Sequence, residues 1–223
     1  ATQFLKAEVT YMPHSRVGGD YYDLIEDGNG KIYFCIADVS GKGMAAALLM
    51  SNFQAALRTL LRSHTDLETL IHQLNFTLFD LTKGERFITF FIGEYTKDTG
   101  ELQFVNAGHN PPVLRDLKTN SVEFLEAGTT ILGAFESLPF MEVGRRREMK
   151  DFMLHLFTDG LTEAMNPAEE EFGEERFREL VEKNSAQDPS EFHQEFRIVL
   201  DKFTAKVPFH DDLTLLSLCF SSS

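Results

Sequence analysis

The feature that most constrains the fold is a buried strand that ends on a carboxylate and passes directly into a glycine turn. An almost wholly apolar run, residues 32–37, reaches Asp38, and Ser40-Gly41-Lys42-Gly43 follows shortly after. From Met44 the chain is rich in Ala and Leu, which are strong helix formers. The two glycines permit a tight turn and close approach of the backbone to a ligand. By itself the stretch indicates either an ordinary strand-turn-helix corner capped by its aspartate or a corner that binds a ligand.

Two further predicted strands also carry an aspartate at one end. The apolar run 152–157 leads into Asp159, and the run 213–220 begins directly after Asp211 and Asp212. Neighbouring antiparallel strands run in opposite directions, so the end of one lies beside the start of the other. If these two strands are such neighbours, Asp159 and Asp211 lie at the same edge of a sheet.

A fourth aspartate, Asp20, precedes a short predicted strand, residues 21–25. The sequence Asp-Gly-Asn-Gly at 27–30 is a strong signal for a β-hairpin turn. Residues that face each other in an antiparallel hairpin lie at equal distances from the centre of the turn. Asp20 and Asp38 each lie nine residues from Asn29, so they should face each other at the open end of the hairpin. We therefore expect four carboxylates to converge.

Carboxylates that lie together repel one another, and without cations their pKa values rise. Hard oxygen ligands suit Mg²⁺ or Mn²⁺ far better than zinc. Two such ions about 4 Å apart activate a water molecule and neutralise a phosphate group. The four aspartates therefore predict a two-metal site for phosphoryl chemistry.

Five motifs occur in an order that is found in one protein family: Val-Gly-Gly-Asp-Tyr-Tyr-Asp (17–23), Ala-Asp-Val-Ser-Gly-Lys-Gly (37–43), Asn-Ala-Gly-His-Asn-Pro-Pro (106–112), Thr-Asp-Gly-Leu-Thr-Glu-Ala (158–164) and His-Asp-Asp-Leu-Thr (210–214). The chain resembles the bacterial SpoIIE/RsbU-type serine phosphatases, a branch of the PP2C (PPM) metal-dependent phosphatases, over about residues 7 to 220. The order of predicted strands and helices indicates an α+β domain. The resemblance implies a four-layer αββα sandwich, in which two stacked antiparallel sheets are flanked by helices. We expect residues 1–223 to form a single domain.

The resemblance also implies a role for each residue of the predicted site. The metal ligands would be Asp20, Asp38, the Val39 carbonyl, Asp159 and Asp211. Asp38 would bridge two Mn²⁺ or Mg²⁺ ions, with Asp20 and Asp211 on one side and Asp159 at the other metal. Asp211 is preferred to Asp212 because the family's ligand is the first residue of this pair.

Four other polar residues lie in or near these motifs and could act in substrate binding, proton transfer or support of the ligands. Arg16, four residues before Asp20, is a candidate to bind the substrate phosphate, and the alternative is a solvated loop arginine. Eukaryotic relatives carry a histidine, thought to protonate the leaving group, where this chain has Ser40, so a metal-bound water would supply that proton. His109 is either catalytic or a residue that fixes its turn by hydrogen bonds. Asp23 lies either behind the metal ligands or on the surface.

The resemblance implies a metal-dependent protein serine/threonine phosphatase. Substrates in the family are phosphorylated STAS-domain proteins, the anti-anti-sigma factors of partner-switching pathways. Such enzymes are often the output module of a sensor or receiver protein and are switched by upstream domains or homodimer contacts. The alternatives are an inactive docking module for a STAS protein and a hydrolase of small phosphate esters. The presence of every acidic ligand argues against the docking module.

Composition restricts the partners and the location. The formal net charge of −14 argues against nucleic acid and anionic membranes as partners. No apolar run approaches the ~20 residues needed to span a bilayer, and no signal peptide is visible, so we expect a cytoplasmic protein without membrane insertion. Cys35 and Cys219 lie in apolar predicted strands and should be buried, reduced thiols.

Overall fold

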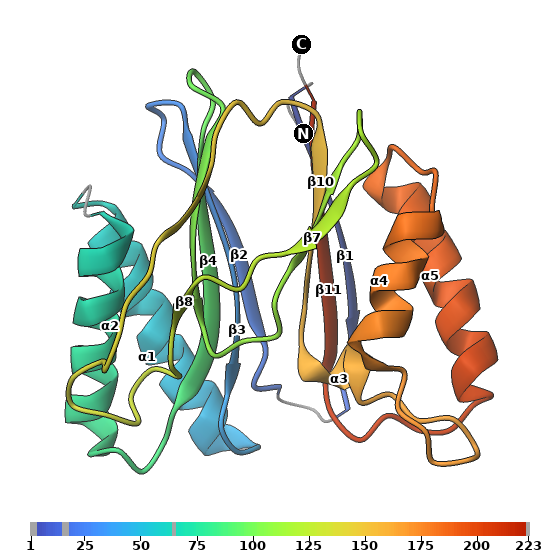
Figure 1. Cartoon of the computed structure of the whole chain (residues 1–223). Coiled ribbons are helices and arrows are strands. Elements are labelled where there is room, and N and C mark those ends of the chain that lie inside the picture. The colour runs from blue at the N-terminus through green and yellow to red at the C-terminus, as the bar shows by residue number, and fades with distance from the viewer. Residues whose placement is uncertain (1–3, 15–17, 64–65, 222–223) are drawn as a thin grey trace. The chain divides into compact units, whose positions relative to one another are not determined.

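The computed structural model describes residues 4–14, 18–63 and 66–221 (Figure 1). It divides into two compact units. Unit 1 comprises Ala1–Ser15, Pro112–Phe124 and Lys150–Ser223, and unit 2 comprises Arg16–Pro111 and Leu125–Met149. Neither unit is a continuous segment, because the chain passes between them after residues 15, 111, 124 and 149. A single domain over residues 1–223 stays a prediction.

Unit 1 contains one antiparallel sheet with helices on one of its faces (Figure 1). Its strand order is β1 (Leu5–Met12), β11 (Leu213–Phe220), β10 (Phe152–Phe157), β6 (Val113–Asp116) and β7 (Val122–Phe124). Its helices are α3 (Asp159–Thr162), α4 (Gly173–Lys183) and α5 (Pro189–Thr204). All residues of β10 and β11 are buried, which explains why both strands read as largely apolar runs rather than as an alternating pattern.

Phenylalanine rings fill the space between this sheet and its helices. The ring of Phe177, on α4, has its centroid 4.7 Å from that of Phe157 on β10. It lies 6.2 Å from the ring of Phe192 and 6.1 Å from that of Phe196, both on α5. Edge-to-face and tilted pairs of this kind add about 0.5–1.5 kcal/mol each beyond the burial of their area. Phe177 therefore holds both helices on the sheet.

A buried polar chain crosses the same unit. His155 on β10 and His193 on α5 both contact the Ser217 hydroxyl on β11, each at 2.8 Å, and His193 Nδ1 lies 2.8 Å from Thr10 Oγ1 on β1. Within the described residues, His155 Nε2 is buried without a hydrogen-bond partner. If Nε2 carries no proton, it is an acceptor without a partner, which costs less free energy in a buried position than an N–H without a partner. His155 therefore carries its proton on Nδ1 and donates it to Ser217, and Ser217 donates to His193. Burial lowers the pKa of His193 to about 4 and that of His155 well below its ordinary value.

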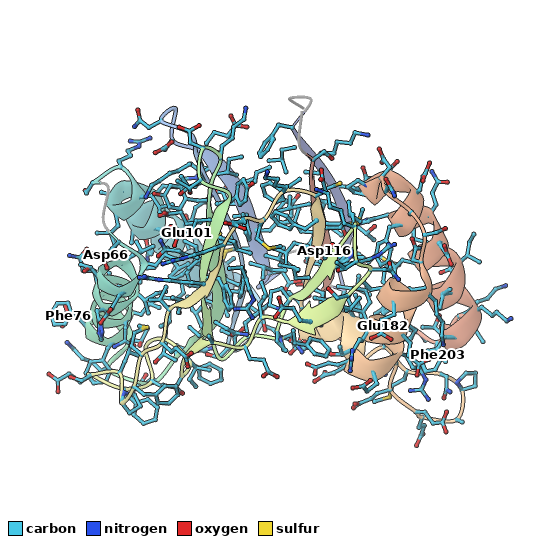
Figure 2. All side chains as sticks on the ribbon, turned by 45° about the horizontal axis from the view of Figure 1, so that its top comes forward. Asp66, Phe76, Glu101, Asp116, Glu182 and Phe203 are labelled. Carbon is cyan, nitrogen blue, oxygen red and sulfur yellow. The ribbon has the colours of Figure 1, made fainter. Side chains whose placement is uncertain are left out.

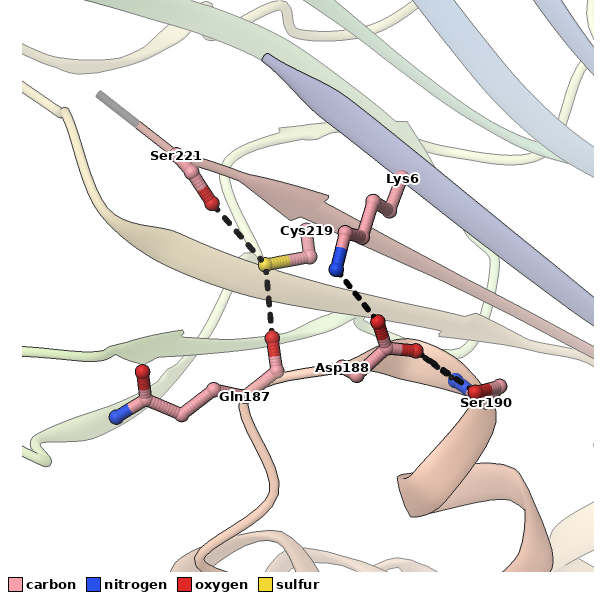
Figure 3. A network of polar contacts seen from close by, with 6 residues as sticks. All are labelled: Lys6, Gln187, Asp188, Ser190, Cys219 and Ser221. Atoms are coloured by element: carbon pink, nitrogen blue, oxygen red, sulfur yellow. Dashed lines mark hydrogen bonds and ion pairs between the residues drawn. The ribbon is translucent and has the colours of Figure 1, made fainter. Parts of the chain in front are cut away.

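The start of α5 is tied to the sheet by a second polar network (Figure 3). Lys6 Nζ on β1 lies 2.7 Å from Asp188 Oδ2, and Asp188 Oδ1 accepts from the Ser190 backbone N–H at 2.9 Å. The same carboxylate therefore caps the helix and binds a strand, and its pKa is lowered to about 2 by Lys6 and Ser190. The Cys219 thiol donates to the Gln187 carbonyl at 3.4 Å. Cys219 and Cys35 are both buried free thiols, as predicted.

Unit 2 contains a mixed sheet covered on one face by α1 (Met44–Leu61) and α2 (Leu67–Thr82) (Figure 1). Its strand order is β2 (Tyr21–Glu26), β3 (Lys31–Val39), β4 (Ile88–Thr96), β5 (Glu101–Ala107) and β8 (Gly128–Thr129), and β9 (Gly144–Arg146) also pairs with β5. The pairs β2–β3, β3–β4, β4–β5 and β5–β9 are antiparallel, whereas β5–β8 is parallel. The prediction of an α+β fold with antiparallel sheets is confirmed, and the parallel pairing in this sheet is confined to the two-residue strand β8 at its edge.

Local chemistry explains where the elements of unit 2 begin. The Asp27 carboxylate accepts from the Asn29 and Lys31 backbone N–H groups at 2.7 and 3.0 Å, which closes the predicted hairpin turn. The Asp66 carboxylate, labelled in Figure 2, accepts from the Thr69 N–H at 2.9 Å and caps α2. The hairpin turn at residues 27–30 is thus confirmed.

Helix α1 bears on the expectation that no apolar run of this chain is long enough to span a bilayer. Among the described residues, it is the one helix long and apolar enough to cross a membrane by length and composition alone. A core helix of a globular unit passes the same test. Helix α1 buries a stripe in the core of unit 2: Ala46, Met50, Phe53, Leu57 and Leu61.

We expect Phe177→Ala to lower the free energy of unfolding by about 3–5 kcal/mol, since it removes a fully buried ring and leaves a cavity. The matched control is Phe76→Ala. Phe76 is 63% exposed and projects from α2 away from the sheet (Figure 2), so its removal should change stability by no more than about 0.5 kcal/mol. Urea unfolding of both variants measures the difference, and equal losses would contradict the assigned core.

The buried histidines also predict a pH dependence. Their folded-state pKa values lie below the ordinary value of 6.5, so only the unfolded chain takes up their protons as the pH falls from about 6.5 towards 4. Stability should therefore fall in that window, by up to about 1.4 kcal/mol per pH unit for each histidine. Urea midpoints between pH 7 and pH 4.5 should show a shallower slope in His193→Asn and an unchanged slope in His72→Asn, because His72 is exposed on α2.

Candidate metal-binding site

In unit 2 the hairpin register brings two predicted ligands together. Tyr21 pairs with Ala37 in the β2–β3 ladder, and the next step of that register sets Asp20 opposite Asp38. Asp38 is the penultimate residue of β3 and is half-buried. The predicted pairing at the open end of the hairpin is confirmed.

The backbone at Gly19 lies directly over the oxygen atoms of this corner. A Cβ atom on Gly19 would stand 3.0 Å from Asp38 Oδ1 and 3.4 Å from the Val39 carbonyl oxygen. Only a residue without a side chain leaves the space beside both oxygens open. The donors gathered here are carboxylate and carbonyl oxygens, which fit Mg²⁺ or Mn²⁺.

In unit 1 the other two predicted ligands share one edge of the sheet. Phe157 pairs with Leu215, and the Thr158 N–H donates to the Thr214 carbonyl at 3.1 Å just beyond the end of β10. Asp159 follows as the first residue of α3, and Asp211 lies shortly before β11. The prediction that both lie at one rim is therefore confirmed within unit 1.

The structure also distinguishes Asp211 from Asp212. Asp212 is only 5% exposed, and its Oδ1 accepts from the His14 backbone N–H at 2.7 Å. Its backbone carbonyl lies 2.0 Å from where a Cβ on Gly160 would be, so it touches the turn that carries Asp159. Asp212 thus fixes the loop after β1 and the Asp159 turn. Asp211 is more exposed and is the better candidate to meet a metal.

The predicted ligand set is divided between the two units, each of which is described by itself. Asp20, Asp38 and Val39 belong to unit 2, and Asp159 and Asp211 belong to unit 1. Across residues 4–14, 18–63 and 66–221, no group of three or more His, Cys, Asp or Glu side chains is arranged to hold a metal. Convergence of the four carboxylates therefore stays a prediction. Arg16, the phosphate-binding candidate, lies outside the described residues.

His109 takes the structural role that the sequence left open. Its backbone N–H donates to Asn106 Oδ1 at 2.8 Å, and Asn106 Nδ2 donates to its carbonyl at 2.9 Å. Its Nδ1 lies 2.8 Å from Thr89 Oγ1 on β4. With 6% exposure, His109 is a residue that fixes the turn after β5.

Asp23 braces α1 against the hairpin. Its carboxylate accepts from Arg58 Nε and Nη2 at 2.8 and 2.9 Å and from the Tyr21 hydroxyl. Burial by itself would raise its pKa, but the hydrogen bonds from Arg58 and Tyr21 lower the pKa below its ordinary value. Asp23 is therefore neither a surface residue nor a ligand, and it connects β2 to the helix that follows Asp38.

A well-formed cavity in unit 2 lies elsewhere. It has a volume of about 570 Å³ and is lined by residues of the β2–β3 turn and the end of α1, among them Asp27, Tyr33, Arg58 and Leu61. The turn and Asp38 stand at opposite ends of β3, roughly 25 Å apart at the rise of an extended strand. The cavity is not part of the candidate site.

Comparison with known proteins gives a consistent set of relatives. The family model described as "Stage II sporulation protein E (SpoIIE)" matches residues 28–221. "Phosphoserine phosphatase RsbU" of Bacillus subtilis is 30% identical over 208 residues, which are 93% of this chain and 61% of RsbU. The chain thus spans less than two thirds of the curated relatives that it matches.

Solved structures share the fold. The SiaA-PP2C domain of Pseudomonas aeruginosa matches with a TM-score of 0.84 and 20% identity, over 96% of this chain and 86% of that domain. RsbX in complex with magnesium matches with a TM-score of 0.72 and 15% identity, over 99% of this chain and 98% of RsbX. The predicted PP2C-like fold is confirmed by these similarities.

We expect Asp38→Asn and Asp159→Asn to abolish Mn²⁺ binding while the fold is kept, because each removes one negative charge and one hard ligand from the predicted set. Calorimetric titration with Mn²⁺ measures the loss, and circular dichroism checks the fold. The control is Asp80→Asn, whose side chain is 66% exposed on α2. Wild-type affinity in either ligand variant would contradict the two-metal site.

Proposed function

This chain belongs to the SpoIIE family, and from that premise we propose that it is a PP2C-type phosphatase that hydrolyses phosphoserine or phosphothreonine in proteins. The observation that carries the proposal is the family match together with the register that sets Asp20 opposite Asp38. That corner offers hard oxygen donors beside a glycine backbone that leaves room for an ion. Similarity to RsbU, which is named a phosphoserine phosphatase, supports the same reaction.

In this proposal, the ions are held by Asp20, Asp38, the Val39 carbonyl, Asp159 and Asp211. Bound Mn²⁺ or Mg²⁺ supplies Lewis acidity, which activates a water and neutralises the phosphate. Asp38 is paired near the end of the β3–β4 ladder, and Asp159 comes just after the β10–β11 ladder. Regular strand pairing therefore fixes the backbone close to both proposed ligands. Water adds to phosphorus, the bond from phosphorus to the serine oxygen breaks, and the serine leaves with a proton. Ser40 Oγ accepts from the Phe87 N–H at 2.9 Å, so its oxygen already has a structural partner.

The substrate in this proposal is a phosphorylated STAS-domain protein, an anti-anti-sigma factor of a partner-switching pathway. The proposal includes an upstream sensor or receiver domain and homodimer contacts as means of regulation, and a cytoplasmic location. Helix α1 begins directly after the Asp38 turn and is braced by Asp23, so an upstream segment that moves α1 would act on the ligands. The formal net charge of −14 argues against nucleic acid as a substrate or partner in this function.

The deciding experiment compares a phosphorylated STAS-domain protein with an aryl phosphate, each with and without Mn²⁺. We expect Mn²⁺-dependent release of phosphate, much faster from the protein. Binding of the STAS protein without hydrolysis would favour the inactive docking module. Hydrolysis of the aryl phosphate alone would favour an enzyme for small phosphate esters.

Arg16 has its own prediction. If its guanidinium binds the substrate phosphate, Arg16→Ala should raise KM more than it changes Mn²⁺ affinity, because an interaction common to substrate and transition state is lost. Steady-state kinetics at saturating Mn²⁺ measure KM, and calorimetry measures the metal. Unchanged kinetics would identify a solvated loop arginine.

A further inference from the structure

The turn after Asp38 is held by Arg86 and Phe87, the two residues immediately before β4. The Ser40 N–H donates to the Phe87 carbonyl at 2.9 Å, and Ser40 Oγ accepts from the Phe87 N–H at 2.9 Å. The Ser40 carbonyl accepts from Arg86 Nη1 at 2.9 Å. The backbone N–H, the hydroxyl oxygen and the carbonyl of Ser40 therefore all bond to Arg86 and Phe87.

Gly41 is matched to Arg86. Its φ is +97°, in the region that favours glycine, and a Cβ there would lie 2.0 Å from Arg86 Nη1 and 3.3 Å from Arg86 Cζ. The guanidinium thus occupies the space that any side chain at position 41 would need. The turn can adopt this path only with glycine at 41, and the arginine uses the room that the glycine leaves.

Arg86 acts at the point where the strand pairing stops. The β3–β4 ladder ends with Val39 paired to Ile88. Beyond it, Ser40 to Gly43 lie outside any strand or helix, and Gly41 and Gly43 have positive φ. Glycines lose the most conformational freedom on ordering. The two bonds between Ser40 and Phe87 restrain the start of this segment, and the Arg86 hydrogen bond to the Ser40 carbonyl extends that restraint towards Gly41.

Peptide geometry connects this restraint to the Val39 carbonyl. The Val39 C=O and the Ser40 N–H belong to one planar trans peptide group and point in opposite directions. Because the Ser40 N–H points to the Phe87 carbonyl on the β4 side, the Val39 carbonyl points away from β4. It points towards Gly19, whose added Cβ would stand 3.4 Å from it.

We propose that Arg86 is a positioning residue that holds the Ser40 carbonyl and so, together with the Phe87 backbone, keeps the Val39 carbonyl in its direction. This inference rests on the proposed function, in which that carbonyl is a metal ligand. Arg86 itself touches neither the metal nor the substrate in this role. Its effect is to keep one ligand oxygen in the geometry that Mg²⁺ and Mn²⁺ require, since these ions tolerate little departure from octahedral coordination.

The test uses Arg86→Ala, Arg86→Lys and the control Arg62→Ala, an exposed arginine at the other end of α1. Calorimetry gives the Mn²⁺ dissociation constant, and kinetics on an aryl phosphate give kcat and KM. We expect Arg86→Ala to weaken Mn²⁺ binding roughly tenfold, as the loss of one charge-assisted hydrogen bond predicts. Saturating Mn²⁺ should restore kcat, and KM should not change. Arg86→Lys should recover part of the affinity, because an ammonium can still reach one carbonyl.

A second variant makes the assignment specific. Gly41→Ala places a methyl group where the Arg86 guanidinium lies, so it should weaken Mn²⁺ binding as Arg86→Ala does. Alanine at φ +97° also strains the turn by itself, so the double variant should resemble Gly41→Ala and fall short of the sum of the two single effects, since both variants disrupt the same contact. Full additivity would contradict the coupling of the two residues.

Three results would overturn the proposal. A raised KM with unchanged Mn²⁺ affinity would make Arg86 a substrate contact. A lower melting temperature of the metal-free protein with unchanged Mn²⁺ affinity would make it a scaffold residue. If the wild-type protein binds no Mn²⁺, the Val39 carbonyl is not a metal ligand, and Arg86 cannot act by positioning it. Failure of the proposed function is separate: a wild-type protein that binds Mn²⁺ but hydrolyses no phosphate ester would refute the enzyme, while Mn²⁺ affinity would still test Arg86.

Discussion

The register of the β2–β3 hairpin is the constraint on which the predicted ligands of unit 2 depend. The turn is closed by Asp27, whose carboxylate accepts from two backbone N–H groups and whose own N–H donates to the Lys31 carbonyl. From the turn, the residues of β2 and β3 pair one by one as far as Tyr21 and Ala37, and the next pair in this register is Asp20 and Asp38. A slip of one residue would turn every side chain of β2 to the opposite face. The turn at one end of the strands therefore helps to place the two predicted ligands at the other end.

Unit 1 fixes its register by a different device. His155 and Ser217 are cross-strand partners in the β10–β11 ladder, and their side chains bond to each other in a fully buried position. A shifted register would leave a buried imidazole or hydroxyl unpaired, which costs more than any apolar mismatch on the same strands. The polar chain through His193 therefore specifies the pairing that brings Asp159 and Asp211 to one rim. This explains polar residues within an otherwise apolar strand.

Local signals predicted much of this arrangement. Strands β5, β10 and β11 have the bounds that their apolar runs indicate, and the hairpin register follows from residue numbers alone. The short elements could not be found in this way. Helix α3 has only four residues, and β8 has two, so neither carries a periodic pattern. Strand β8 forms through its pairing with β5, which is distant in sequence from its own two residues. The roles of Gly19 and Arg86 depend on contacts with residues that are distant in sequence or separated by a turn, which no periodicity records.

The motif Ala-Asp-Val-Ser-Gly-Lys-Gly has a physical reason at most of its positions. Val39 is 2% exposed, so its side chain anchors the strand end in the core, and its carbonyl is the backbone oxygen proposed as a ligand. Ser40 is short enough for its hydroxyl to accept from the Phe87 N–H, and a bulkier side chain would lose that bond. Gly41 leaves room for Arg86, and Gly43, at φ +79°, turns the chain into α1. A backbone oxygen used as a ligand cannot be specified by its own side chain. Its direction has to be set by the residues around it, which is why the motif extends beyond its single aspartate.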